Sequence, residues 1–311
     1  MKDFLLELAE AIRAAVREHQ QAGGQRQVLG DSPGGDAQFD IDEVAERIVW
    51  QRALAADRTL AVYTEDGSLR LTGPDPEQLL IVDPIDGTRP TSAGLEMGTV
   101  SIAAAPFGGG QPTIGDVSHA LVLEIASGAW LYAAAAEPAL QSSGYPWPVP
   151  RLSRNHDLDR LFWSFELNGH PMGLMQQALG RLVDRSANSG GVFVFNSASF
   201  SISRIVTGQL DAYVDIGNRM LRDYPETEQA FRRAGRGRIL HLFPYDIAAS
   251  VLIAKKAGVP ITDGYGRSLD GMRLLDLTPL NQRSCIAAGN GELHEALLTE
   301  LNWTLAEAGA A

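Results

Sequence analysis

The sequence predicts an α/β protein of the layered α+β type, in which helices and sheets stack on one another. Two kinds of segment are mixed along its 311 residues: stretches with apolar residues at helical spacing, and short apolar runs that stop at polar clusters. They do not alternate strictly as strand–helix units, and no segment repeats at a fixed period. The composition, 45% hydrophobic and 21% charged, is typical of a globular protein with a sizeable core.

Helical periodicity begins at the N-terminus, where residues 3–19 form an amphipathic pattern. Residues 20–38 are rich in Gly and Gln and predict a loop or hairpin. Two later helical patterns end at Gly208 and Gly258, the residue type expected just beyond a helix C-terminus. The further helices are predicted at residues 41–55, 174–183, 197–207, 246–257 and 292–300.

Short apolar runs predict buried strands between these helices. They lie at residues 60–63, 79–82, 100–105, 120–125, 130–134, 161–165, 210–214 and 286–288. The segment 142–150 is rich in Pro and Gly and is the candidate domain boundary. The sequence therefore predicts an N-terminal α+β domain over 1–150 and a C-terminal α/β domain over 151–311.

The charge balance and the single cysteine exclude several classes. A formal net charge of −12, with the acid excess concentrated in residues 1–100, argues against a general DNA-binding or anionic-membrane-binding surface. Cys285 alone allows neither an internal disulfide nor a cysteine-cluster zinc site, and we expect it to be buried. Neither a signal-peptide pattern nor an apolar run of 18 residues is found, so we expect a cytoplasmic protein without membrane or nucleic-acid partners.

One predicted strand ends at two aspartates three residues apart, Asp83 and Asp86, within the segment DPIDGT. Pro84 stiffens the turn between them, and Gly87 allows the backbone to approach a ligand closely. Two carboxylates on one tight turn repel each other, so a hard cation such as Mg²⁺, which prefers oxygen ligands, would stabilise them. Thr88 would then begin a helix or turn whose hydroxyl and free N–H groups could meet a phosphate. By itself the pattern is equally typical of an Asx turn or a helix cap.

Two further acids stand at the ends of predicted elements. Glu65 follows the strand at 60–63, within the cluster TEDG. Asp246 precedes an apolar helix, where an aspartate is most often the N-cap. Taken alone, neither acid identifies a site.

In this order the motifs resemble those of the inositol monophosphatase family, part of the Mg²⁺-dependent, lithium-sensitive sugar phosphatase superfamily. The resemblance covers about residues 36–298. It implies an αβαβα sandwich and, usually, a homodimer. It rests on five matches: Asp36 and Asp42 spaced as Asp-x5-Asp, Glu65, DPIDGT from Asp83 to Thr88, the run from Ser197-Ala198-Ser199 to Gly208-Gln-Leu-Asp-Ala-Tyr213, and Tyr245-Asp246, where the family more often has Trp before the Asp.

The resemblance also implies the roles of individual residues. Thr88, paired with Asp42, would orient or deprotonate the attacking water, and Glu65 is counted with this catalytic set. Two or three Mg²⁺ ions would be held by Glu65, Asp83, the Ile85 carbonyl, Asp86 and Asp246, with Asp83 shared between ions. The substrate, a small phosphate ester, would be bound by Gly87, Thr88, Ala198, Asp215 and Arg89.

The chain departs from the family pattern at two places. Family members commonly continue DGT with Thr-Asn-Phe, whereas this chain has Arg89, which would pair either with the substrate or with a structural acid. About two dozen extra residues also follow Asp215, in the segment 216–244. This insert is either a solvated surface helix or a lid or oligomer contact that brings arginine to a second anionic group of the substrate. Its charged residues are Arg219, Arg222, Arg232, Arg233, Arg236 and Arg238 against Asp223, Glu226 and Glu228.

The metal ligands alone do not decide the substrate, because related folds use one metal site for several phosphate esters. Inositol monophosphate is the leading candidate. Fructose 1,6-bisphosphate, histidinol phosphate and 3′-phosphoadenosine 5′-phosphate are alternatives within the same reaction class. A non-catalytic phosphate- or metal-binding protein is the alternative of another class.

Overall fold

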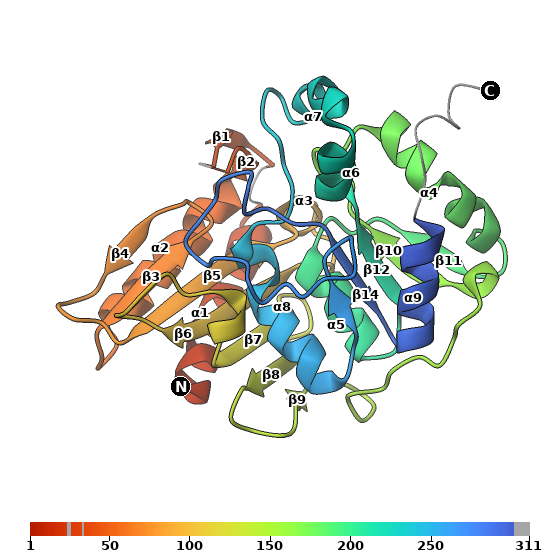
Figure 1. The fold of residues 1–311 in the computed structure, drawn as a ribbon. Helices are drawn as coiled ribbons and strands as arrows, with labels where there is room; N and C mark the ends of the chain where they lie inside the picture. Colours follow the sequence, from red (N-terminus) through yellow and green to blue (C-terminus); the bar gives the residue numbers. More distant parts are fainter. Residues whose placement is uncertain (24–25, 33, 302–311) are drawn as a thin grey trace.

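The computed structural model describes residues 1–23, 26–32 and 34–301; the other residues of the two predicted domains, 24–25, 33 and 302–311, lie outside the described part. Besides a two-stranded sheet of residues 28–31 and 37–39, the chain forms two main sheets, and Figure 1 shows helices between these two and on both outer sides. This is the αβαβα arrangement that the family resemblance implied, and it confirms the predicted fold class. No helix in the described part of the chain is long and apolar enough to cross a membrane.

The helices and strands follow one another without strict alternation. The α-helices are α1 (Lys2–Gln21), α2 (Asp40–Leu54), α3 (Thr88–Ser92), α4 (Met172–Ser186), α5 (Ala198–Val206), α6 (Gly217–Asp223), α7 (Glu228–Ala234), α8 (Pro244–Ala257) and α9 (Gly291–Glu300). The strands are β1 (Val28–Asp31), β2 (Ala37–Phe39), β3 (Leu60–Thr64), β4 (Leu69–Leu71), β5 (Gln78–Asp86), β6 (Thr99–Pro106), β7 (His119–Glu124), β8 (Trp130–Ala134), β9 (Gln141–Ser143), β10 (Phe162–Phe165), β11 (Gly191–Phe193), β12 (Ala212–Asp215), β13 (Ile261–Thr262) and β14 (Cys285–Ala288).

The larger sheet has the strand order β4-β3-β5-β6-β7-β8-β9 and is covered on both faces. Alternate side chains of β5 point to opposite faces: Leu79 and Ile81 enter the core that also holds α5 and α8, whereas Leu80 and Val82 pack with α1 and α2. A strand buried on both faces has no polar face to present, which is why it is a continuous apolar run in the sequence.

The smaller sheet has the order β11-β10-β12-β14-β13. Its inner face shares the core with α5 and α8, to which Tyr213 and the buried Cys285 contribute. Its outer face packs under α4 and α9 through residues such as Trp163, Leu179 and Leu297. β10 and β12 are parallel neighbours, so their carboxyl ends open at one edge of the sheet, toward the centre of the molecule.

Some sequence predictions differ from the structure in physically clear ways. The helix predicted from Asp246 begins earlier, at Pro244, because proline is tolerated at the first helical position. Asp246 is therefore not the N-cap but the third helical residue, and its carboxylate accepts the N–H of Phe243. β5 continues through the predicted turn to Asp86, with a register shift against β6 between Asp83 and Asp86. The strands β1, β2, β4, β9, β11 and β13 were not predicted individually, because none of these two- to four-residue strands is a fully buried apolar run.

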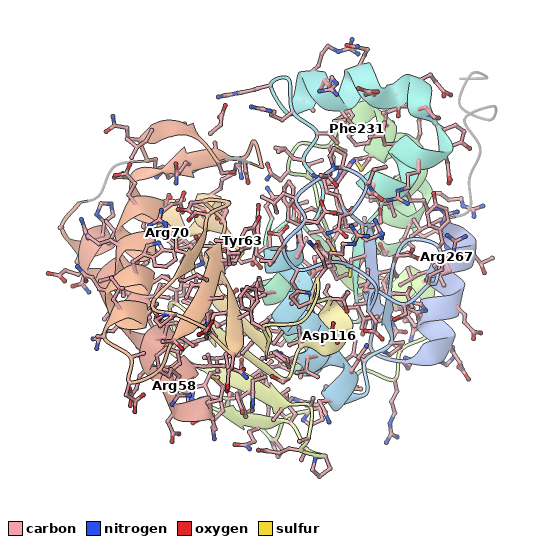
Figure 2. All side chains as sticks on the ribbon, turned by 60° about the vertical axis from the view of Figure 1, so that its left-hand side comes forward. Arg58, Tyr63, Arg70, Asp116, Phe231 and Arg267 are labelled. Atoms are coloured by element: carbon pink, nitrogen blue, oxygen red, sulfur yellow. The ribbon has the colours of Figure 1, made fainter. Side chains whose placement is uncertain are left out.

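The insert 216–244 is more than a solvated surface helix. It forms α6, a 3₁₀ turn and α7, which project at the top of Figure 1. Met220 and Phe231 are fully buried in the outer core of the smaller sheet. Figure 2 shows Phe231 where α7 meets the rest of the chain. The insert is thus part of the folded body of the protein.

Gly258 offers a test of how α8 ends. It has φ of 84° at the helix C-terminus, and a Cβ added there would have only Leu152 within 4 Å, so an alanine would suffer backbone strain and no severe clash. We expect Gly258→Ala to lower the free energy of unfolding by about 1 kcal/mol. Gly180→Ala, within α4, should instead raise it by about 0.5–1 kcal/mol, since alanine is the better helix former. Urea denaturation of both variants checks the opposite signs, and equal effects would contradict the strain argument.

Candidate active site

A deep pocket lies between the two sheets, where the carboxyl ends of β5, β10 and β12 meet the N-termini of α5 and α8. Arg89 is the one lysine or arginine among its described lining residues. Seven acids line the same pocket: Asp36, Glu65, Asp83, Asp86, Glu166, Asp215 and Asp246.

The DPIDGT segment builds one side of this pocket. Asp83 and Asp86 are buried near the end of β5, and the chain then turns at Gly87 into α3. Gly87 has φ of 91°, and a Cβ at this position would lie 2.7 Å from the Met97 carbonyl oxygen. Only glycine meets both conditions, so the sharp turn that brings Thr88 to the pocket depends on it.

Three of the acids are each oriented by a backbone N–H group. Asp83 Oδ1 accepts from the N–H of Ile85 at 3.1 Å, and Asp246 Oδ2 accepts from the N–H of Phe243 at 2.6 Å. Asp86 Oδ2 accepts the N–H of Ser199, in the first turn of α5, at 2.6 Å and also the Ser199 hydroxyl. In each case these bonds engage one carboxylate oxygen, which leaves the other available for a ligand.

The acids raise one another's pKa because they are buried and close together. Burial raises the pKa of Asp83 well above its usual value, and the charges of Glu65 and Asp86 add to the effect. Burial and then Asp42 raise the pKa of Glu65, while burial and then Asp86 raise that of Asp246. A nearby cation would reverse these shifts by stabilising the charged forms.

Asp42 and Thr88 lie together, as the resemblance implied. Burial raises the pKa of Asp42 to about 7, opposed by hydrogen bonds from the Phe39 N–H and the Thr88 side chain. The Thr88 hydroxyl also lies 3.0 Å from the Ile85 carbonyl oxygen. Asp42 sits behind Thr88, which itself lines the pocket together with Ile85 and Ala198.

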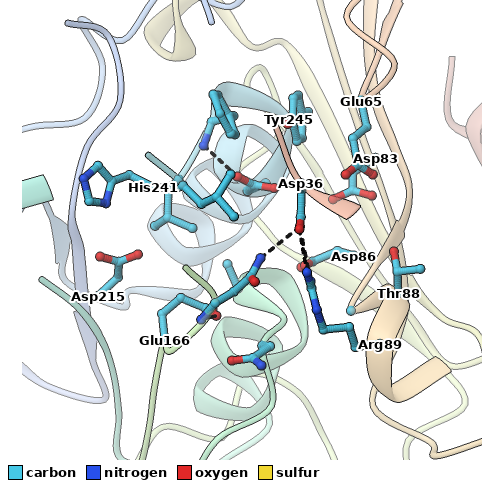
Figure 3. Close-up of a pocket in the computed structure, with 18 of the residues that line it drawn as sticks. Asp36, Glu65, Asp83, Asp86, Thr88, Arg89, Glu166, Asp215, His241 and Tyr245 are labelled. Atoms are coloured by element: carbon cyan, nitrogen blue, oxygen red, sulfur yellow. Dashed lines mark hydrogen bonds and ion pairs between the residues drawn. The ribbon is translucent and has the colours of Figure 1, made fainter. Parts of the chain in front are cut away.

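Arg89 is paired with an acid of the chain. Its guanidinium binds Asp36 at 2.6 and 3.3 Å, and the Asn168 side-chain amide also donates to Asp36 at 2.9 Å. Figure 3 shows Asp36 at the centre of the pocket with these bonds dashed. The ion pair matches the structural alternative for Arg89; its contact with a substrate stays a prediction.

The far end of the pocket contains the predicted Asp215 and also Glu166, His170 and His241, which were not predicted from the sequence. Figure 3 shows Asp215, His241 and Glu166 on the side opposite Glu65, Asp83 and Thr88. Glu166 follows β10 directly, just as Asp215 ends the parallel strand β12, so an acid at a strand end was a usable signal. His170 and His241 carried no such signal, since each follows an irregular segment. The expected substrate acid Asp215 is buried and lines this end.

The arginines of the insert do not line the pocket in the part of the chain that the structure describes. Arg219 binds the carbonyl of Gly264, Arg222 binds those of Leu280 and Gln282, and Arg232 pairs with Glu228. In this conformation the insert brings no arginine into the pocket lining that the structure describes, and its role as a lid or oligomer contact stays a prediction. Its pocket residues are Leu240, His241, Leu242 and Phe243.

The donor set of the pocket fits a hard divalent cation. Glu65, Asp83, Asp86 and Asp246 offer carboxylate oxygens only, the type that Mg²⁺ prefers, and repulsion among them favours a positive ion. In the part of the chain that the structure describes, no three His, Cys, Asp or Glu side chains are already placed so that they could hold a metal ion. A cation at this site would therefore draw the acids together or complete its coordination with water and substrate oxygens.

Comparison with known proteins agrees with this geometry. The family model described as "Inositol monophosphatase family" matches residues 1–304. The chain belongs to the inositol monophosphatase family. Members of this family are phosphoric monoester hydrolases, and the chain is an enzyme of that class.

Individual relatives are distant but cover nearly the whole chain. A fructose-1,6-bisphosphatase/inositol-1-monophosphatase of Methanothermobacter thermautotrophicus is 24% identical over 305 residues, 96% of either chain. One of the same name from Thermococcus kodakarensis is 24% identical, covering 87% of this chain and 85% of its own. The fold is shared with the extragenic suppressor protein SuhB of Bartonella henselae, with a TM-score of 0.69, 19% identity, and coverage of 97% of this chain and 98% of that chain.

The raised pKa values predict how stability depends on pH. Burial raises the pKa of Glu46, on α2, from 4.5 to about 8, and that of Asp42 from 3.8 to about 7. An acid with a higher pKa in the folded chain binds its proton more tightly when folded, so its contribution to stability is lost as pH rises toward that pKa. We expect the metal-free protein to lose stability between about pH 4 and 8.

Glu46→Gln isolates one part of this loss. Because glutamine stays neutral, the variant should be more stable than the wild type at pH 8 by ~3 kcal/mol and equal to it near pH 4. Glu43→Gln, at an exposed position of the same helix, is the matched control and should follow the wild type. Urea denaturation in the presence of a chelator measures all three, and an unchanged slope for Glu46→Gln would contradict the assignment.

Proposed function

We propose that the protein is a Mg²⁺-dependent phosphatase of a small phosphorylated polyol or sugar, with inositol monophosphate as the leading substrate. The observation that carries the proposal is the pocket of seven acids whose one basic lining residue, Arg89, is already paired with Asp36. A phosphate dianion would be repelled by such a pocket. The proposal therefore requires bound cations before substrate can bind.

Glu65, Asp83, the Ile85 carbonyl, Asp86 and Asp246 would hold these cations, two or three per site. Bound Mg²⁺ would supply charge neutralisation and a lowered pKa for a coordinated water. The chain's own part is to hold one oxygen of each aspartate with a backbone N–H, so that the other oxygen stays directed at the ligand. Phosphoryl transfer depends chiefly on such positioning and charge stabilisation.

Thr88 and Asp42 would position the attacking water. The Thr88 hydroxyl donates to the Ile85 carbonyl in this structure and lies beside Asp42. Threonine is no base by itself, so the hydroxyl would turn to donate to Asp42, and Asp42 would act through it. The N–H groups of Gly87 and Thr88 would bind phosphate oxygens. Ala198 and Asp215 would contact the alcohol part of the substrate, and Arg89 would reach it only after leaving Asp36.

The acidic residues at the far end of the pocket favour a substrate with a single phosphate group. Fructose-1,6-bisphosphatase/inositol-1-monophosphatase is the name of both curated relatives, so a bisphosphate is the second candidate. A second phosphate would lie near Glu166 and Asp215, whose described neighbours in the pocket include no lysine or arginine besides Arg89. An uncharged polyol meets no such repulsion and finds acceptors for its hydroxyl groups.

Other parts of the proposal rest on family membership. We propose a homodimer and a cytoplasmic location, with a phosphate ester as the small-molecule partner. We also retain the division into units 1–150 and 151–311, although α5 and α8 of the second unit pack on the large sheet of the first.

Asp83→Asn tests the metal site. The substitution removes a negative charge that we place between the cations, so Mg²⁺-dependent phosphate release should fall by at least about 100-fold, while the fold is kept. Release of p-nitrophenol from p-nitrophenyl phosphate with and without Mg²⁺ measures the loss. Circular dichroism and urea denaturation check the fold.

Asp184→Asn, the same change at an exposed position of α4, is the control and should keep wild-type turnover. Wild-type turnover by Asp83→Asn, or equal wild-type activity with and without Mg²⁺, would contradict the proposal. A panel of inositol 1-phosphate, fructose 1,6-bisphosphate, histidinol phosphate and 3′-phosphoadenosine 5′-phosphate then ranks the substrates.

A further inference from the structure

His170 and His241 stand at the far end of the pocket with all four ring nitrogens unpartnered. Both side chains are at least nine-tenths buried, and both line the pocket. Neither Nδ1 nor Nε2 of either ring has a hydrogen-bond partner. The nearest acid oxygen, Asp215 Oδ1, lies 3.8 Å from His170 Nε2, which is too far for a hydrogen bond. Buried polar nitrogens without partners are costly, so their presence in a ligand pocket points to a ligand.

The two rings are held as a pair by the insert. Their centroids are 5.6 Å apart, and the edge of Phe231 from α7 packs against both, at 5.9 Å from His170 and 5.2 Å from His241. Gly217, which begins α6, leaves the space that the rings fill, since a Cβ there would lie 1.9 Å from His170 Nε2. α6 and α7 thus fix the rings, and the end of the insert supplies His241.

The charges around the pair fit an uncharged ligand. Burial lowers the pKa of His170 to about 4 and that of His241 well below its usual value, so both rings are neutral near pH 7. A neutral imidazole has one donor and one acceptor nitrogen, the combination that hydroxyl groups match. Asp215 Oδ2, also buried and unpartnered, adds an acceptor beside them.

We propose that His170 and His241 form a substrate-contacting pair that hydrogen-bonds the hydroxyl groups of the alcohol part of the substrate. This inference rests on the proposed phosphatase function and adds to it a specificity element built by the insert. Figure 3 shows His241 on the side of the pocket opposite Asp83 and Thr88, which would act at the phosphate end. Removal of the pair should therefore affect substrate choice more than the reaction itself.

The test compares two substrates that share a phosphate but differ in hydroxyl groups. The substrate with hydroxyl groups is inositol 1-phosphate, or another polyol phosphate if the wild type hydrolyses that one faster. The substrate without hydroxyl groups on its alcohol part is p-nitrophenyl phosphate. His170→Leu and His241→Leu should each lower kcat/KM for the polyol phosphate by about 10- to 100-fold and change that for the aryl phosphate by less than about 3-fold. His241→Asn, which keeps a donor and an acceptor, should recover part of the loss.

His294→Leu is the matched control, because His294 is also buried but binds Thr262, away from the pocket. It should leave the ratio of the two kcat/KM values unchanged. A parallel fall for both substrates in the His170 and His241 variants would mean a structural role only and would overturn the proposal. If the wild type released no phosphate from either substrate, the proposed function itself would fail, which is a distinct result.

Discussion

The crowding of carboxylates in one buried pocket is the constraint on which the rest of the structure depends. Glu65 follows β3, Asp83 and Asp86 lie near the end of β5, and Asp246 lies in the first turn of α8. Burial raises the pKa of each, and acidic neighbours add to this effect for Glu65, Asp83 and Asp246. Such an arrangement is unfavourable for folding unless something offsets the repulsion. Chain stability and ligand binding are therefore linked in this protein through the same side chains.

The fold offsets part of this cost locally. Asp86 lies at the N-terminus of α5 and Asp246 in the first turn of α8, where free backbone N–H groups favour negative charge. Asp83 accepts from the N–H two residues further on. The core helices α5 and α8 thus hold the sheets together and also present donors to the acids. The bonded oxygen fixes the orientation of each carboxylate, while the other oxygen remains for a cation.

The parts of the site that could be predicted from the sequence are those whose residues lie close together in one motif. DPIDGT is a strand end, a sharp turn and a helix start within six residues, so Asp83, Asp86 and Thr88 could be placed from the sequence, and the structure brings them together. Asp246 lines the pocket with them, although the helix begins two residues before it because proline is tolerated at the first helical position. The charge of the insert suggested arginine at the substrate, yet Arg219, Arg222 and Arg232 bind carbonyls and acids outside the pocket. Whether a surface cation turns inward depends on packing that a charge count does not contain.

His170 and His241 show the opposite limit. They are 71 positions apart in the sequence, which gives no sign that they form a pair. The pair exists only in the folded chain, where Phe231 packs against both rings and their nitrogens have no hydrogen-bond partner. The pocket then has two ends of different chemistry: buried acids that attract cations and so admit phosphate, and neutral nitrogens that match hydroxyl groups. The acids at the first end are matched in the family motifs, while His241 comes from the extra segment. On the proposed function, reaction and selectivity would be supplied by separate parts of the chain, and the insert would change which alcohol is accepted without disturbing the residues that act on the phosphate.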